Sequence, residues 1–217
     1  KYNIEFVSAN PTGPMHIGHS RGAIYGDVLA NLLKFNGNNV VKEYYINDYG
    51  NQVINFTESV FFRLREIKFD EKFKNKENLY PGEYVVDIAK KILKDVPDID
   101  LGDFKKIFPI LSEITLKHSM ILIKDDLKSL GISHDNFVSE KNLVKKNLVS
   151  KSIKYLQDKK FVEVGFLSPP KGEDNKDWKK IKRLIFKSTL FGDDTDRALQ
   201  KNDGSWTYFA NDIAYHA

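Results

Sequence analysis

Residues 5–19 constrain the fold more than any other stretch of this chain. An extended segment from Tyr2 to Val7 meets Asn10-Pro11-Thr12-Gly13-Pro14, where proline and glycine end regular structure. His16-Ile17-Gly18-His19 follows and opens a long amphipathic pattern. A strand, a tight turn and a helix N-terminus present unpaired backbone N–H groups, so this stretch predicts a phosphate-binding turn.

The side chains at this turn suit the same role. Gly18 lacks a Cβ where a ligand has to come close. His16 and His19 fall on one face of the first helical turn, where both imidazoles can donate hydrogen bonds to phosphate oxygens. The alternative is that the two histidines only start a helix and bind nothing.

The next elements predict a parallel sheet. Apolar residues recur at helical spacing from about residue 18 to 36, and Gly37 stands where a C-terminal cap is expected. Residues 40–46 are rich in β-branched and aromatic side chains and predict a buried strand. Strand, helix and strand form one βαβ unit, whose ligands lie beyond the carboxyl ends of the strands.

With these residues in view, the chain resembles a known family. His16-Ile17-Gly18-His19 matches the HIGH signature of class I aminoacyl-tRNA synthetases, and its flanks resemble arginyl-tRNA synthetases in particular. The run from Phe186 to His216 resembles the same family. The resemblance implies an α/β fold: a Rossmann-like parallel-sheet nucleotide-binding domain with a largely helical insertion. We expect its first half at 1–68, the insertion at 69–166 and its second half at 167–217.

The composition of the chain indicates its cellular compartment and the kinds of site it can contain. The 217 residues carry a net charge of +4 and no cysteine, which excludes disulfides and thiolate metal sites. No apolar run reaches membrane-spanning length and no signal-peptide pattern opens the chain, so we expect a cytoplasmic protein with no membrane partner. The mild basic excess is compatible with an RNA partner without identifying one.

The middle of the chain is predicted to be mostly helical. We expect helices at about 49–66, 83–94, 103–130 and 143–156 and a short strand at 161–164. Asn47 or Asp48 either caps the first of these helices or belongs to the pocket. His118 reads as a helix-face residue rather than a metal ligand. Lysines surround the 143–156 helix, which is either a solvated face or a contact for tRNA phosphates: Lys141, Lys145, Lys146, Lys151, Lys154, Lys159 and Lys160.

Toward the C-terminus, 168–174 predicts a loop, Arg183–Thr189 a strand that returns to the sheet, and 205–209 another strand before a helix from Asn211. Three carboxylates at 193, 194 and 196 suggest either a Mg²⁺ site or, more simply, a solvated turn.

The resemblance also implies roles for individual residues. It assigns His16, Gly18 and His19 to ATP, with His16 and His19 as the catalytic pair. It assigns the arginine pocket to Glu5, Ser8, Ala9, Asn10, His19, Tyr208 and Asp212. Because a guanidinium is a rigid fork of donors, it needs acceptors such as two carboxylates and a phenol oxygen. Without the resemblance, a core tyrosine at 208 and a helix-capping aspartate at 212 would be the simpler interpretation.

The implied activity is ATP-dependent activation of L-arginine and its transfer to tRNA(Arg), with Mg²⁺ bound to ATP and no structural metal on the protein. We expect a monomer. The alternatives are another HIGH-type synthetase or nucleotidylyltransferase, or a non-catalytic RNA-binding relative. Some arginyl-tRNA synthetases carry a lysine where Gly13 stands here, so a KMSKS-like loop would have to supply that cation. Neither this loop nor an anticodon-binding domain is in the 217 residues, so we expect a fragment that is inactive alone.

Overall fold

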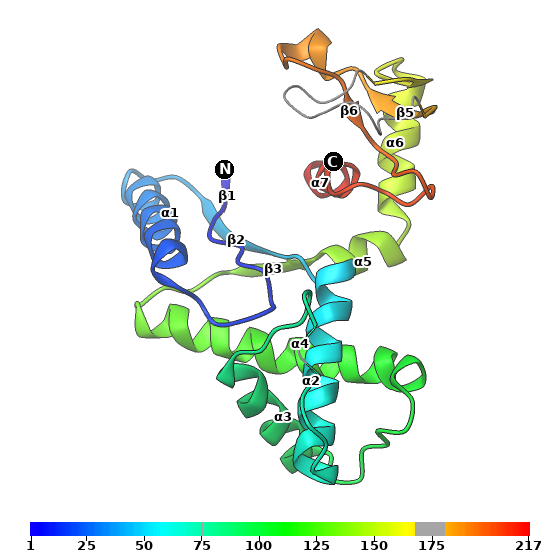
Figure 1. Ribbon diagram of the computed structural model, residues 1–217. Helices are drawn as coiled ribbons and strands as arrows, with labels where there is room; N and C mark the ends of the chain where they lie inside the picture. Colours follow the sequence, from blue (N-terminus) through cyan, green and yellow to red (C-terminus); the bar gives the residue numbers. More distant parts are fainter. Residues whose placement is uncertain (75, 168–180) are drawn as a thin grey trace. The chain divides into compact units, whose positions relative to one another are not determined.

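The computed structural model describes residues 1–74, 76–167 and 181–217 (Figure 1). The loop predicted at 168–174 lies outside these residues. The chain divides into two compact units, 1–139 and 140–217, each of which is described by itself. The predicted division at residues 68 and 166 remains a prediction.

The first unit is built on a parallel sheet. Strands β1 (Tyr2–Glu5), β2 (Val40–Ile46) and β3 (Asn136–Ser139) pair in the order β1-β2-β3, with Glu5 opposite Glu43 and Tyr44 opposite Phe137. The predicted α/β class and parallel βαβ unit are therefore confirmed. Strand β3 was not predicted, because a four-residue segment with two apolar side chains gives almost no periodic signal.

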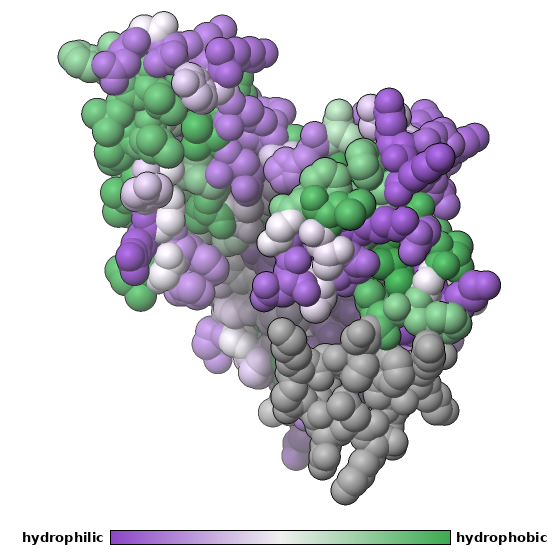
Figure 2. Space-filling view, turned by 90° about the horizontal axis from the view of Figure 1, so that it is seen from above, coloured by the Kyte–Doolittle hydropathy of each residue, from purple (hydrophilic) through white to green (hydrophobic). Residues whose placement is uncertain are grey.

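Helix α1 (Ile17–Phe35) connects β1 to β2 and packs through its small residues. Its buried positions are Ala23, Gly26 and Ala30, whereas its large apolar side chains are exposed: Ile17, Ile24, Tyr25, Val28, Leu29, Leu32 and Phe35. Figure 2 shows this hydrophobic surface at the left of the view. The periodicity that predicted the helix thus belongs mainly to its outer face, since only small side chains allow α1 to approach the sheet closely.

Three helices of the first unit pack together around a hydrophobic core. They are α2 (Asn51–Phe69), α3 (Glu83–Asp95) and α4 (Phe104–Ser129), close to the predicted spans. One face of α3 is fully buried against α2 and α4. Pro109 lies inside α4 without shifting its start, because the Asp103 side chain caps the helix by accepting the N–H of Lys105 at 2.8 Å.

The second unit contains an antiparallel sheet. Strands β4 (Val162–Gly165), β5 (Arg183–Phe186) and β6 (Arg197–Ala198) pair in that order, and a 3₁₀ helix follows β5 at Ser188–Phe191. The prediction that Arg183–Thr189 returns to the parallel sheet is therefore wrong, since β5 pairs with β4 and β6.

The helices of the second unit also differ from expectation. The single helix predicted at 143–156 is two, α5 (Glu140–Lys145) and α6 (Leu148–Asp158), because Asn147 adopts a φ of 55° between them. The strand predicted at 205–209 is wrong: α7 (Tyr208–His216) begins there, capped by the Thr207 hydroxyl, which accepts the N–H of Ala210. A core formed by residues of α6, α7 and β4 includes Val149 and Ile153, and Leu199, which directly follows β6, belongs to the same core. None of the described helices combines the length and the apolar composition needed to span a bilayer.

Candidate active site

Two histidines cap the start of α1 reciprocally. His16 is the N-cap, and its Nδ1 accepts the backbone N–H of Gly18 at 3.1 Å and that of His19 at 3.4 Å. In return, the Nδ1 of His19 accepts the N–H of His16 at 3.4 Å. The two rings stack with centroids 3.7 Å apart. The arrangement is a capping box in which imidazoles replace the usual hydroxyl and carboxylate.

This cap determines which atoms remain available to a ligand. Since both Nδ1 atoms accept hydrogen bonds, the neutral imidazoles carry their protons on Nε2. Burial, and then the charge of His16, lowers the pKa of His19, which favours its neutral form at pH 7. The prediction of unpaired first-turn N–H groups is wrong for Gly18 and His19, because the imidazoles already occupy them. The two Nε2–H groups remain as donors that this turn offers.

Gly18 is required by the cap itself. A Cβ at Gly18 would lie 3.0 Å from Cε1 and 3.1 Å from Nδ1 of His16, closer than side chains normally approach. The absence of a side chain therefore lets the His16 ring fold over the first turn.

The chain leaves β1 through a strained turn. Val7 and Ser8 have φ values of 64° and 31°, and the N–H of Ser8 donates to the carbonyl of Phe6 at 2.9 Å. An i to i+2 hydrogen bond across a residue with positive φ is a rare and strained γ-turn, and valine is among the residues least suited to it. The turn brings the Ser8 hydroxyl back to the Glu5 carboxylate, to which it donates, while the Ser8 Oγ accepts the N–H of Tyr45 at 3.0 Å.

The residues after the γ-turn are fixed by contacts that the sequence did not reveal. Ala9 is buried, and its carbonyl accepts the buried Tyr44 hydroxyl at 2.8 Å. Burial raises the pKa of Tyr44, which therefore remains a donor. Asn10 is exposed. The Tyr84 hydroxyl donates to the carbonyl of Thr12 at 2.9 Å.

The end of the turn is anchored to α4. The N–H of Met15 donates to the Asp126 carboxylate at 3.0 Å, across a separation of 111 residues. Such long-range anchors carry no local sequence signal, so only the fold reveals them.

Within the first unit, the structure thus brings together Glu5 and Ser8 and, separately, His16, Gly18 and His19. The other two predicted site residues belong to the second unit. Tyr208 opens α7 and is 76% exposed, and Asp212 follows one turn later and is partly buried. The predicted strand-to-helix join between them is wrong, but their i, i+4 spacing on one helix places both on one face.

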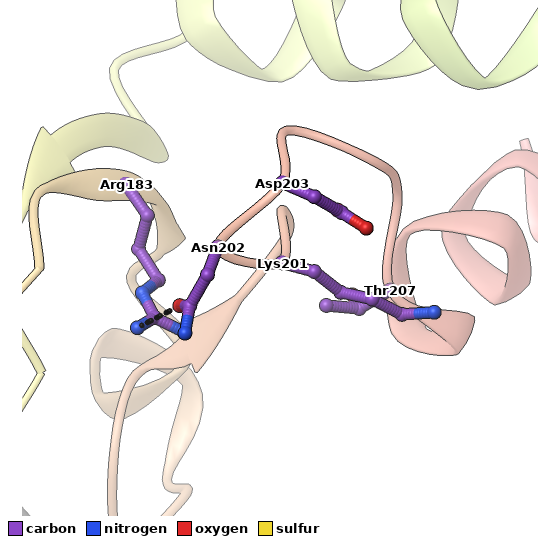
Figure 3. Close-up of a pocket in the computed structure, with 5 residues that line it drawn as sticks. All are labelled: Arg183, Lys201, Asn202, Asp203 and Thr207. Atoms are coloured by element: carbon purple, nitrogen blue, oxygen red, sulfur yellow. Dashed lines mark hydrogen bonds between the residues drawn. The ribbon is translucent and has the colours of Figure 1, made fainter. Parts of the chain in front are cut away.

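A cavity of about 410 Å³ lies beside the start of α7 (Figure 3). It is lined by Arg183, Lys201, Asn202, Asp203 and Thr207. Arg183 donates to the Asn202 side chain at 2.8 Å, while Lys201 extends toward Thr207 (Figure 3).

Several other candidates have structural explanations. Asp48 does not cap α2, whose N-cap Gly50 has no side-chain hydrogen bond, and instead accepts the Ser139 hydroxyl at 2.6 Å. His118 is buried on α4 with its Nε2 3.2 Å from the Asp95 carboxylate.

Two carboxylates of the acidic turn at 193–196 also accept hydrogen bonds from protein side chains. Arg197 donates twice to Asp193 at 2.6 Å and thereby lowers the pKa of that carboxyl. Asp196 accepts the Thr189 hydroxyl at 2.7 Å. Over the described residues, no group of three His, Asp or Glu side chains is placed to hold a metal ion.

Comparisons with known proteins address the family. A sequence profile described as "tRNA synthetases class I (R), catalytic domain" matches residues 1–95. The arginine–tRNA ligase of Pelagibacter ubique (strain HTCC1062) is 56% identical over all 217 residues, and that of Ehrlichia ruminantium (strain Gardel) is 54% identical. Residues 1–95 are therefore similar to a class I tRNA synthetase catalytic domain, and the whole chain is similar to part of these arginine–tRNA ligases. The chain spans 38% of the length of each of these two relatives.

Solved arginyl-tRNA synthetase structures resemble the whole chain. A Campylobacter jejuni structure named as an arginyl-tRNA synthetase superposes with a TM-score of 0.82 at 32% identity, covering all of this chain and 44% of that one. The Thermus thermophilus arginyl-tRNA synthetase gives a TM-score of 0.62 at 21% identity, covering 99% of this chain and 35% of the other, which supports the fold.

Proposed function

We propose that the chain supplies ATP- and arginine-binding elements of an arginine–tRNA ligase, which activates L-arginine with ATP and transfers it to tRNA(Arg). The observation that carries this proposal is the reciprocal histidine cap of α1. It fixes two imidazoles whose Nδ1 atoms accept backbone N–H groups, so that their Nε2–H groups are available at the start of a helix that follows the first strand of a parallel sheet.

The proposed chemistry begins with attack of the arginine carboxylate on the ATP α-phosphate. The new bond joins a carboxylate oxygen to phosphorus, and pyrophosphate leaves with the electrons of the broken P–O bond. A ribose hydroxyl at the 3′ end of the tRNA then attacks the arginyl carbonyl carbon to form an ester, the bond to the adenylate phosphate oxygen breaks, and AMP and the hydroxyl proton are released. This reaction requires alignment and stabilisation of the developing phosphate charge rather than a protein nucleophile. His16 and His19 would donate from Nε2 to phosphate oxygens, and the α1 dipole would add to their effect.

A second set of residues suits the guanidinium of arginine. Glu5 is exposed at the end of β1, and the Ser8 hydroxyl restrains one of its carboxylate oxygens. A carboxylate restrained in this way can accept two N–H groups from a guanidinium without first losing much rotational freedom. Asp212 and the exposed Tyr208, one turn apart on α7, would add a carboxylate and a phenol oxygen.

Mg²⁺ fits this proposal as a companion of ATP. Since the described residues hold no three-ligand cluster, the phosphates would provide most of its coordination, as is usual for Mg²⁺ with nucleotides. The ion would help to neutralise phosphate charge. We further propose that the protein works as a monomer in the cytoplasm.

Isothermal titration calorimetry on the complete protein tests the proposal. Arginine, lysine and glutamine are titrated separately, as is ATP with Mg²⁺, each with and without tRNA(Arg). We expect ATP to bind and arginine to bind at least tenfold more tightly than either competitor. Preference for another amino acid would identify a different HIGH-type synthetase, and absence of ATP binding would identify a non-catalytic relative.

A further inference from the structure

The positive charge of the chain is concentrated in the second unit. Residues 140–217 hold 16 Lys and Arg against 11 Asp and Glu, whereas residues 1–139 hold 18 against 19. Six of these cations are exposed lysines in and around α6, here called the α6 lysine surface: Lys145, Lys146, Lys151, Lys154, Lys159 and Lys160. The only carboxylate between residues 141 and 160 is Asp158.

The orientation of α6 is fixed by its opposite face. Val149 and Ile153 are 1% exposed and pack in a core with Ala210 and Ala214 of α7. Lys151 and Lys154 consequently face away from this core. Because the apolar face of α6 is already buried within the protein, α6 is not available to insert that face into a membrane.

The lysines are not explained by contacts within the protein. Among the described residues, none of the six takes part in an ion pair within 4.0 Å. Lys146 and Lys151 flank the start of α6, whose first turn contains no acidic residue. A helix disfavours cations near its N-terminus, and like charges one turn apart destabilise it further. The surface therefore lowers the stability of the unit, as expected of a surface used for binding.

An aromatic side chain lies within this surface. The Tyr155 side chain is 61% exposed, and the ammonium of Lys159 lies 5.7 Å from its ring centroid. Exposed rings among cations are the combination with which proteins bind unpaired nucleic-acid strands, because the ring stacks on a base while the cations contact phosphates. With 11 residues, α6 is roughly 16 Å long, enough to follow several phosphates of one strand.

We propose that the α6 lysine surface binds the phosphate backbone of the tRNA acceptor arm, with Tyr155 stacking on a base of its single-stranded 3′ end. This inference rests on the proposed function for the choice of RNA, but it assigns the contact to residues outside the candidate active site. Lys151 and Lys154 contact phosphates, and Tyr155 distinguishes an unpaired end from a duplex.

The test compares neutralised variants of the complete protein. Binding of fluorescently labelled tRNA(Arg) is measured by anisotropy from 50 to 300 mM KCl for the wild type, for K151Q/K154Q and for Y155A. The matched control is K105Q/K106Q, which removes the same charge from two exposed lysines on α4. All three variants change exposed side chains, and their urea unfolding midpoints show whether folding is unaffected.

We expect K151Q/K154Q to weaken tRNA binding at least tenfold at low salt. The slope of log K against log [KCl] should fall in magnitude by about 1.4–1.8, the value for two lost phosphate contacts. The control should stay within twofold of the wild type. Y155A should weaken intact tRNA but leave a blunt acceptor-stem duplex unaffected. Equal affinity and slope for K151Q/K154Q and the wild type would overturn the proposal.

Arginine and ATP titrations of the same variants separate this inference from the function on which it rests. Unchanged arginine and ATP binding with weakened tRNA binding supports both. If the wild type binds arginine and charges tRNA(Arg) while K151Q/K154Q binds tRNA normally, the α6 assignment fails and the proposed function stands. If the wild type does not select arginine, the proposed function itself fails.

Discussion

Two glycines one turn apart on α1 provide a matched test of how closely this helix packs on β1. A Cβ built on Gly26 would lie 2.2 Å from Cγ and 2.4 Å from Cβ of Phe6, whereas one built on Gly22 would meet no atom within 4 Å. The Phe6 Cβ is attached directly to the backbone, so rotating its ring cannot relieve the overlap. Gly26→Ala therefore requires α1 and β1 to separate.

The expected free energies of unfolding have opposite signs for the two substitutions. Alanine gains about 1 kcal/mol over glycine in a helix interior. At Gly22 this gain stands alone, so Gly22→Ala should stabilise the chain by about 0.5–1 kcal/mol. At Gly26 the gain in helix propensity is opposed by an overpacking cost of about 1–3 kcal/mol. We expect the upper end of this range, because the clash includes the Cβ of Phe6, which cannot move without the backbone. Gly26→Ala should therefore destabilise by about 1–2 kcal/mol.

Urea unfolding followed by circular dichroism measures both changes, with the slope m as the check that the unfolding transition is comparable. A double-mutant cycle with Phe6→Leu should show a coupling of about 1 kcal/mol or more, because the smaller side chain makes room for the new methyl group. If Gly26→Ala stabilises the chain as much as Gly22→Ala does, the close approach of α1 to β1 is refuted.

Three further predictions concern the site and its surroundings. In the complete protein, His16→Asn and His19→Asn should each slow arginine-dependent ATP–pyrophosphate exchange about 10²–10³-fold, because each substitution removes a preorganised donor. The control is His216→Asn, which changes an exposed histidine on α7. Asp212→Asn should weaken arginine binding by about 3–5 kcal/mol in calorimetry and leave ATP binding unchanged, since the guanidinium loses a desolvated partner. Burial lowers the pKa of His134 in the folded protein. As the pH falls below about 6.5, the unfolded chain therefore binds a proton at His134 before the folded chain does, and the free energy of unfolding should decrease until the pH reaches the lower folded pKa. His134→Phe should remove this loss, as measured by urea unfolding at about pH 5 and pH 8.

Each of these predictions has a clear contrary result. Exchange within twofold of the wild type in either histidine variant would remove the role assigned to that imidazole. Unchanged arginine affinity in Asp212→Asn would leave Asp212 as a structural residue. A pH dependence of stability that survives His134→Phe would show that it comes from groups other than His134.

The sequence predicts those parts of the fold whose signals are local. Strand β2 and helices α1, α3 and α4 fall within a few residues of their predicted ends, because strong periodicity, glycine caps and proline breaks fix them. The error at 205–209 has an equally local cause. The aromatic residues there favour a strand, but the Thr207 cap and the buried Ala210 favour a helix, and the helix forms.

The residues of the candidate site remain a prediction from the sequence, and the geometry among them could not be predicted. The histidine motif locates the first turn of α1 from sequence alone. The exchange of Nδ1 hydrogen bonds between His16 and His19 depends on how their rings stack, and the γ-turn at Val7 depends on the pairing of Ser8 with β2. The γ-turn is not encoded in a residue pattern, because the contact of Ser8 with Tyr45 forms only when the sheet is assembled. The histidine cap is local to the first turn of α1, but two imidazoles are not the hydroxyl and carboxylate by which a capping box is predicted.

The γ-turn at Val7 also has a consequence for protein engineering. A non-glycine residue held at positive φ costs of order 1–3 kcal/mol, so Val7→Gly is a direct way to make the first unit more heat-resistant. The same change would loosen the link that brings the Ser8 hydroxyl to the Glu5 carboxylate. A selection for thermal stability alone should therefore enrich glycine at this position, and a selection for turnover should remove it, so that the two selections separate at a single codon.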